Sequence, residues 1–297
     1  MSPSSLHTFV QRFPRLCTPR PRECHKGDFG HLALLGGSPG FSGALVLAST
    51  AAVQLGAGRV SAVFCEEKLP QPYLPGYPEV MLATSNHVFS NDHIDSWVIG
   101  CGLGTSAAAA FILARTIKHC AGKNQPLLLD ADALNLLARD ADLSALLARN
   151  ANLHVLTPHP AEAGRLLGVD AETVQRDRRA AALELVQRFH AWIVLKGCRT
   201  LIASPEGQLW ENDSGNAALA SGGSGDVLAG MLGALLAQRL PPEEALPGGV
   251  WLHGAAADSY NDGPVPLIGL RASELAPAVR RLRQQATLLA LNHQEKP

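Results

Sequence analysis

Long apolar runs, paired cysteines and an excess of charge of either sign are all absent from this sequence. No apolar run reaches about 18 residues, so we expect no transmembrane helix. A formal net charge of -1 supplies no positive field that would hold nucleic acid or an anionic membrane. The six cysteines form no CxxC pair and no Cys/His cluster with zinc spacing. We therefore expect reduced thiols in a cytoplasmic protein.

The N-terminal segment also has no apolar stretch of the kind that a secretory signal requires. It carries Arg12, Arg15, Arg20 and Arg22 with few acids, which leaves an organelle presequence open. An irregular N-terminal arm over residues 1–24 is the interpretation that we favour. The 297-residue chain is 46% hydrophobic and has no internal repeat or clear linker. We therefore predict a single domain over residues 25–290.

What the sequence does contain is an alternation of apolar strands and helical segments. The expected strands are 31–37, 59–65, 96–102, 126–134, 153–159, 192–197, 200–205 and 208–212. The expected helices are 43–58, 107–120, 161–168, 227–238, 245–260 and 272–291, with Ser273 as N-cap of the last. The 227–238 segment is apolar around almost its whole circumference, so it should be buried. This order predicts an α/β fold with a mostly parallel sheet covered on both faces.

A glycine-rich loop directly before the buried helix is the strongest feature for function. Gly222, Gly223 and Gly225 let the backbone approach a ligand and point its N–H groups at it, and the helix start adds a positive partial charge. These properties predict a cradle for phosphate oxygens. Asp226, in the first turn, would lie beside it and could accept a proton from a substrate hydroxyl. An ordinary turn with Asp226 as N-cap remains the alternative.

Other polar residues follow expected strands, where the ligands of parallel sheets bind. His159 stands between two prolines and could donate to a ligand carbonyl or phosphate, or be a surface loop histidine. Lys196 could meet a nucleotide phosphate, or be an exposed turn lysine. Asp130 and Asp132 could hold hydrated Mg²⁺ or cap the next helix. The GCGLG segment 100–104 departs from the G-x-G-x-x-G fingerprint, so a Rossmann site is weakly supported.

Six segments in order resemble the motif set of the ADP-dependent (S)-NAD(P)H-hydrate dehydratases: 25–49, 100–104, 127–135, 156–168, 194–203 and 215–238. The resemblance runs from about residue 20 to about residue 285. It implies a ribokinase-like three-layer sandwich, here as a stand-alone carbohydrate-kinase-like domain without the epimerase domain of many members. Two departures are visible: Cys101 replaces the usual proline and Ser224 the usual threonine.

The resemblance also implies roles for residues of this chain. The hydrated nicotinamide substrate would be held by Ala44, Gly102, His159 and Asp226, with Asp226 catalytic. Nucleotide would bind Lys196, Gly197, Cys198, Arg199, Thr200 and Gly225, and the phosphate loop would be Gly222, Gly223, Ser224 and Gly225. ADP or ATP would be co-substrate with Mg²⁺, whose ligands the sequence does not assign, and the enzyme would be a homotetramer without nucleic-acid or membrane partners.

The predicted reaction is dehydration of the S form of hydrated NADH or NADPH by phosphorylation of its hydroxyl and elimination of phosphate. A vitamin-precursor kinase of the ribokinase superfamily is one alternative, because such kinases also have a glycine loop that ends in aspartate. Those kinases tend to carry asparagine at the place of His159. A regulatory nucleotide-binding protein without catalysis is a second alternative, and the intact Asp226 argues against it.

Overall fold

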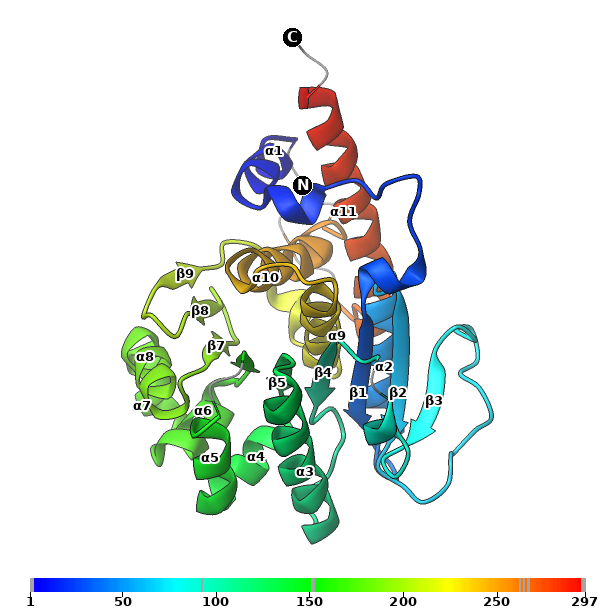
Figure 1. Ribbon diagram of the computed structural model, residues 1–297. Coiled ribbons are helices and arrows are strands. Elements are labelled where there is room, and N and C mark those ends of the chain that lie inside the picture. Colours follow the sequence, from blue (N-terminus) through cyan, green and yellow to red (C-terminus); the bar gives the residue numbers. More distant parts are fainter. Residues whose placement is uncertain are drawn as a thin grey trace.

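A nine-stranded sheet forms the centre of the part of the chain that the structure describes. The structure is a computed structural model that describes residues 3–294 apart from 92, 151–152, 262, 264 and 266–267 (Figure 1). The strands are β1 (His31–Gly36), β2 (Arg59–Phe64), β3 (Met81–Thr84), β4 (Ser96–Ile99), β5 (Leu127–Leu129), β6 (His154–Leu156), β7 (Trp192–Leu195), β8 (Leu201–Ala203) and β9 (Leu209–Glu211). Their order is β3-β2-β1-β4-β5-β6-β7-β8-β9. In this order, all neighbouring strands from β3 through β2 and β1 to β7 pair in parallel. Strand β8 pairs antiparallel with β7, and β9 pairs antiparallel with β8.

Helices cover both faces of this sheet, as Figure 1 shows. On one face lie α1 (Pro3–Arg12), α2 (Ser42–Gln54), α9 (Ser224–Ala237), α10 (Pro242–Asp258) and α11 (Ala272–Gln294). On the other lie α3 (Ala107–Lys123), α4 (Asp132–Arg139), α5 (Ala141–Ala148), α6 (Pro160–Leu167), α7 (Ala171–Arg176) and α8 (Arg178–Phe189). Successive residues of a strand point to opposite faces, so Leu32 and Leu34 enter one core while Ala33 and Leu35 enter the other. The predicted three-layer α/β sandwich is confirmed.

Helix α9 is buried from Val227 to Ala237, as its apolar circumference predicts. It packs directly against α2. A side chain at Gly230 would begin 2.0 Å from the carbonyl oxygen of Ala48, so only glycine permits this approach of the two helices. The ends of the two helices are also joined, because the Gln238 side chain donates to the Leu55 carbonyl over 3.1 Å. Helices α2 and α9 therefore run side by side, from the carboxyl ends of the parallel strands to their amino ends.

The N-terminal segment differs from the irregular arm that the sequence suggested. Residues Pro3–Arg12 form α1 and Pro14–Cys17 form a 3₁₀ turn. Phe9 is buried and stacks on Trp251 of α10, with ring centroids 4.6 Å apart. The expectation was wrong because apolar side chains from residue 9 onward meet a surface that α10 and α11 create only in the folded chain.

Smaller differences concern element ends and short elements. Ser273 lies inside α11, which begins at Ala272, so its prediction as N-cap was wrong. The expected strand 126–134 was too long, because β5 ends at Leu129 and α4 begins at Asp132. Strand β3 and helices α5, α7 and α8 were not predicted; β3 is a four-residue edge strand with no fully buried position, so its pattern is weak. Every helix among the described residues is too short or too polar to cross a membrane, as expected. All six cysteines are free thiols.

Candidate active site

The turns that follow five parallel strands meet at one edge of the sheet. They follow β1, β4, β5, β6 and β7 and carry the polar motifs singled out in the sequence. Neighbouring turns are joined through backbone groups: the Ser38 N–H donates to the Gly102 carbonyl over 2.7 Å, and the Ser38 hydroxyl donates to the same carbonyl over 2.9 Å. A side chain at Gly100 would begin 1.8 Å from the Asp130 carbonyl oxygen. Glycines therefore allow the close approach that brings these motifs together.

The glycine loop ends at the start of α9, at the same edge. Gly223 precedes the helix with φ of 91°, a conformation that favours glycine. No side chain caps the helix start, so backbone N–H groups of the first turn are left for an anion. The Ser224 hydroxyl donates to the Leu219 carbonyl over 2.9 Å, and this hydrogen bond stabilises the conformation of the loop. Asp226 is the third helical residue, so its alternative role as N-cap is wrong.

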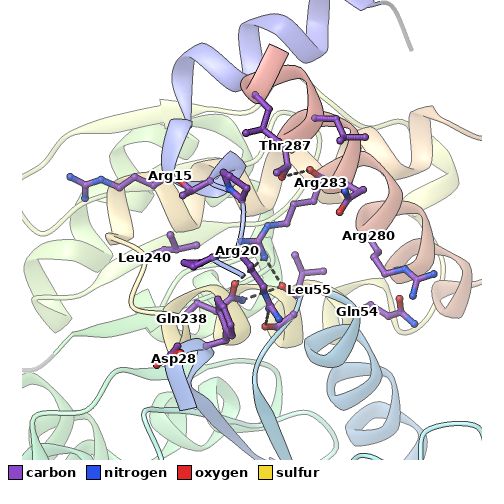
Figure 2. A pocket seen from close by; sticks show the side chains of 18 of the residues that line it. Arg15, Arg20, Asp28, Gln54, Leu55, Gln238, Leu240, Arg280, Arg283 and Thr287 are labelled. Atoms are coloured by element: carbon purple, nitrogen blue, oxygen red, sulfur yellow. Dashed lines mark hydrogen bonds between the residues drawn. The ribbon is translucent and has the colours of Figure 1, made fainter. Parts of the chain in front are cut away.

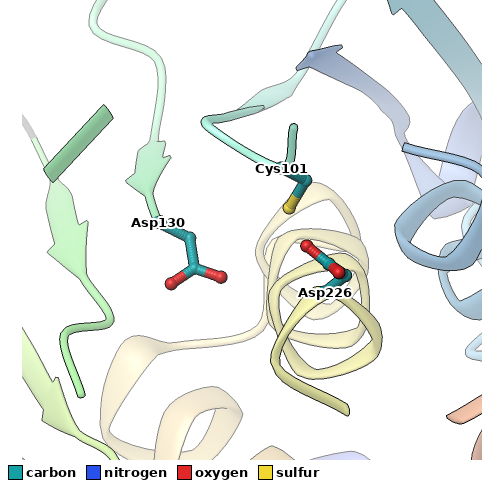
Figure 3. Close-up of side chains that lie close together, drawn as sticks. All are labelled: Cys101, Asp130 and Asp226. Atoms are coloured by element: carbon teal, nitrogen blue, oxygen red, sulfur yellow. The ribbon is translucent and has the colours of Figure 1, made fainter. Parts of the chain in front are cut away.

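Asp226 is half-buried and faces two other polar side chains. Figure 3 shows its carboxylate directed toward Cys101, which follows β4, with Asp130 of the β5 end nearby; their ligand atoms all lie within 4.8 Å of one another. Burial, together with the negative charge of Asp130, raises the pKa of Asp226 to about 6. A hydrogen bond from the Cys101 thiol and the charge of Lys196 oppose that rise. A carboxylate with this pKa is ionised near neutral pH and is a better base than an ordinary aspartate.

Lys196 is the nearest cation to this carboxylate cluster. Its Nζ donates to Asp130 Oδ1 over 2.6 Å and lies 3.9 Å from Glu162 Oε2. Only 17% of its side chain is exposed, so the alternative of an exposed turn lysine is wrong. Burial lowers the pKa of Lys196, but Asp130 and Glu162 together raise it above the ordinary value. A side chain at Gly225 would begin 3.5 Å from Nζ, so a fixed positive charge stands beside the phosphate loop.

His159 begins α6 and is partly exposed at this edge. Its Nδ1 accepts from the N–H groups of Ala161 and Glu162 over 3.1 and 3.3 Å, and the Glu162 carboxylate accepts from the His159 N–H over 2.8 Å. Burial, with Lys196 and Arg165 nearby, lowers the pKa of His159, so the ring is neutral at pH 7. An accepting Nδ1 leaves the proton on Nε2. Nε2 lies 3.4 Å from Glu162 Oε1, and the side chain is 47% exposed, so a ligand can also reach the Nε2 proton.

The segment after β7 forms a tight turn. The sequence analysis identified this segment but not the residue that holds the turn in place. Gly197 has φ of 140° and Arg199 has φ of 56°, and the Thr200 hydroxyl donates to the Gly197 carbonyl over 2.9 Å. Arg178, at the start of α8, donates to the carbonyls of Cys198 and Leu195 over 2.7 and 2.8 Å. Because α8 was not predicted, nothing in the sequence pointed to Arg178 as the residue that fixes this turn.

The predicted substrate residues Ala44 and Gly102 are neighbours. A side chain at Gly102 would begin 3.3 Å from the Ala44 Cβ and 2.5 Å from the Phe41 carbonyl oxygen. Phe41 itself is 62% exposed at this rim, and the sequence analysis did not single it out. Asp132 accepts from the Gly104 N–H over 2.8 Å, and so fixes the 100–104 turn rather than capping a helix. The structure thus brings Ala44, Gly102, His159, Lys196, Gly225 and Asp226 to the same edge of the sheet.

Known proteins match this chain over most of its length. A family model described as NAD(P)H-hydrate dehydratase matches residues 32–280. The ADP-dependent (S)-NAD(P)H-hydrate dehydratase of Neisseria meningitidis serogroup B is 49% identical over 276 residues, which cover 93% of this chain and 92% of that protein. The crystal structure of the ADP/ATP-dependent NAD(P)H-hydrate dehydratase from Bacillus subtilis, co-crystallised with ATP/Mg²⁺, matches with a TM-score of 0.79 at 30% identity and covers 92% of this chain and 96% of that one. A ribokinase-like superfamily protein from Enterococcus faecalis matches with a TM-score of 0.81 at 26% identity and covers 95% and 94%. The chain therefore belongs to the NAD(P)H-hydrate dehydratase family.

Proposed function

We propose that this protein uses ADP or ATP to dehydrate the S form of hydrated NADH and NADPH, and so returns them to the usable cofactors. Asp226 takes the proton from the hydroxyl of the hydrated ring, whose oxygen attacks the terminal phosphoryl group of the nucleotide. The nucleotide leaves one phosphate shorter. The ring nitrogen then expels the new phosphate, a far better leaving group than hydroxide, and loss of a ring proton restores the reduced nicotinamide.

The observation that carries this proposal is the place of Asp226. Its carboxylate has a pKa of about 6 and stands at an uncapped helix start, beside a glycine loop and a buried lysine. The base and the groups that stabilise charge on the transferred phosphoryl group are therefore already in position. We assign the phosphates to residues 222–225 and Lys196, and the rest of the nucleotide to the turn from Gly197 to Thr200.

The substrate would occupy the other side of Asp226. Ala44 and Gly102 form one wall, where a larger residue at position 102 would meet the Phe41 backbone. His159 is neutral and carries its proton on Nε2, so it can donate to the carboxamide or a phosphate of the hydrate. In this proposal the hydroxyl-bearing ring and the nucleotide would bind on opposite sides of Asp226.

Mg²⁺ is proposed as the ion that accompanies the nucleotide phosphates. Asp130 offers the oxygen donors that Mg²⁺ prefers, whereas the Cys101 sulfur beside it does not suit the ion. A hydrated Mg²⁺ needs only one or two protein carboxylates, so Asp130 would suffice and Asp226 would stay free to act as the base. When bound, the ion would neutralise part of the phosphate charge. Lys196 supplies the protein's own share of that neutralisation.

One assay tests the proposed function. The purified protein is incubated with NADH hydrate and ADP, and absorbance at the reduced-nicotinamide wavelength is followed. We expect absorbance to return with the wild type and to be lost with Asp226→Asn, which should turn over about 10²–10⁴-fold more slowly. A vitamin-precursor kinase would consume nucleotide with its own alcohol and leave the hydrate unchanged. The family relationship favours the dehydratase over that alternative.

A homotetramer in the cytoplasm completes the proposal. Six free thiols support a reducing compartment. Exposed aromatic side chains such as Phe111 and Tyr73, 68% and 57% exposed, would be available for contacts between copies. Light scattering at micromolar concentration should give four times the mass of one chain, and the mass of a monomer would contradict the tetramer.

A further inference from the structure

A cavity of about 630 Å³ lies far from Asp226, near the amino ends of the parallel strands. It is bordered by the segment after α1, the end of α2, the residues after α9 and one face of α11 (Figure 2). Helix α2 begins beside Ala44 of the candidate active site and ends at Gln54, in the cavity wall. Its 13 residues span about 20 Å, so the cavity is separate from that site.

The cavity lining carries more positive than negative charge. It includes four arginines, Arg15, Arg20, Arg280 and Arg283, and a single acid, Asp28. Asp28 already accepts from the His25 N–H over 2.8 Å and lies 3.2 Å from the His25 ring, and Arg15 is paired with Glu244 outside the cavity. Within the described ranges, no carboxylate pairs with Arg20, Arg280 or Arg283. Three arginines of the lining thus have no carboxylate partner among the described residues.

Two of these arginines converge on one point. The Arg283 Nη1 donates to the Leu55 carbonyl over 2.5 Å and to Gln238 Oε1 over 3.1 Å, while Arg20 donates to the Gly56 carbonyl. A side chain at Gly56 would begin 2.5 Å from the nearest Arg20 nitrogen and 4.0 Å from that of Arg283. Arg283 Nε also donates to the Leu16 carbonyl over 3.1 Å, and the Arg20 guanidinium lies 3.6 Å from the centre of the Phe29 ring. The carbonyls at the end of α2 supply only the partial negative charge of a helix C-terminus, so they compensate part of the two positive charges and not all of it.

The electrostatics agree with this geometry. Burial, with the positive charge of Arg20, lowers the pKa of Arg283 to about 10. Burial also lowers the pKa of Arg20. Desolvated cations are costly unless an anion pairs with them, and guanidinium groups match carboxylate and phosphate oxygens in two-pronged contacts. Leu55, Leu240 and Leu288 add apolar wall, and the volume is typical of a small-molecule site.

We propose that this cavity binds a small organic anion that carries phosphate or carboxylate groups on an apolar body. Arg20 and Arg283 hold the anionic group at the end of α2. Arg280 adds a further positive charge on the α11 side of the cavity, and the leucines cover the apolar part. The site is independent of the catalytic chemistry, because it shares no residue with the phosphate loop or the substrate wall.

Calorimetric titration at low ionic strength tests the proposal with two probes, inorganic pyrophosphate and citrate. Arg280→Ala is the informative variant, because Arg280 is exposed and makes no hydrogen bond among the described residues. Arg281→Ala is the matched control: the next residue of the same helix, also exposed, but outside the cavity. Arg280→Ala should weaken binding about tenfold or more, and Arg281→Ala should leave it unchanged. The stronger probe identifies phosphate or carboxylate as the preferred group.

Two results would overturn the proposal. One is that neither probe binds the wild type at millimolar concentration. The other is binding that survives Arg280→Ala but is lost in Lys196→Met, which would place the anion in the catalytic phosphate loop instead. Hydrate turnover is measured in parallel and should be unchanged in Arg280→Ala, which shows that the variant is folded.

Discussion

Replacing Asp226 with asparagine should make the protein more stable at neutral pH while it abolishes most activity. The pKa of Asp226 is raised from 3.8 to about 6, first by burial and next by the charge of Asp130. A raised pKa means that the folded protein holds the carboxylate in its ionised form at a free-energy cost. Cys101 and Lys196 reduce this cost, and Asp132 adds to it. Asparagine has nearly the same shape and carries no charge, so the cost disappears.

The magnitude follows from the size of the pKa shift. One pKa unit corresponds to about 1.4 kcal/mol, so the full shift would be worth roughly 3 kcal/mol. Part of the Asp226 side chain is exposed, and solvent screening reduces that value; we expect a gain of about 1–3 kcal/mol. Below the unfolded pKa the carboxyl is protonated in both states and costs nothing. The cost grows as pH rises through the window from about 4 to 6 and is constant above it.

Urea unfolding of the wild type and Asp226→Asn at pH 7.5 and pH 4 measures this effect. The variant should be more stable at pH 7.5, and most of its advantage should vanish at pH 4. Asp213→Asn is the control, because Asp213 is exposed and its replacement should change stability equally little at both pH values. An Asp226→Asn protein that is no more stable than wild type at pH 7.5 would refute the argument that the ionised Asp226 carboxylate lowers the stability of the folded protein.

The same geometry makes four further predictions. The kcat/KM of the wild type should fall about fivefold between pH 6 and pH 5, because the base must be ionised; a flat profile over that range would exclude Asp226 as the base. Cys101→Ala should move this acid limb to higher pH by removing the thiol hydrogen bond that lowers the pKa of Asp226, and an unmoved limb would show that the bond does not form. Asp130→Asn leaves Lys196 without its nearest carboxylate and should lower the free energy of unfolding by about 3 kcal/mol in urea; a loss under about 1 kcal/mol would contradict the pair's role. His159→Ala should weaken hydrate binding and spare nucleotide binding in calorimetric titrations, and an unchanged hydrate affinity would argue against its assignment.

The order of motifs along the chain was enough to predict the sheet and its ligand-binding edge. Each polar motif follows an apolar run, and carboxyl ends of parallel strands share one edge, so convergence could be inferred without coordinates. The all-apolar pattern of the helix predicted the burial of α9, which the structure confirms, and the anion cradle at its start stays a prediction. Weak signals failed: β3 lies at the sheet edge, and α1 becomes ordered only against α10.

The sequence by itself determined which residues could carry the chemistry, because residue type and chain order are local properties. It could not decide between a base and an N-cap for Asp226, or between a phosphate ligand and a surface lysine for Lys196. Tertiary structure excluded the N-cap and the surface lysine, since helix α9 begins two residues before Asp226 and the distant Asp130 draws Lys196 inward. The roles of these two residues as base and phosphate ligand stay predictions. The pKa of Asp226 likewise depends on charges from distant parts of the chain. The arginines of the cavity near the amino ends of the strands are also brought together from distant parts of the chain. Burial and charge proximity arise only when the chain is packed, so no local pattern records them.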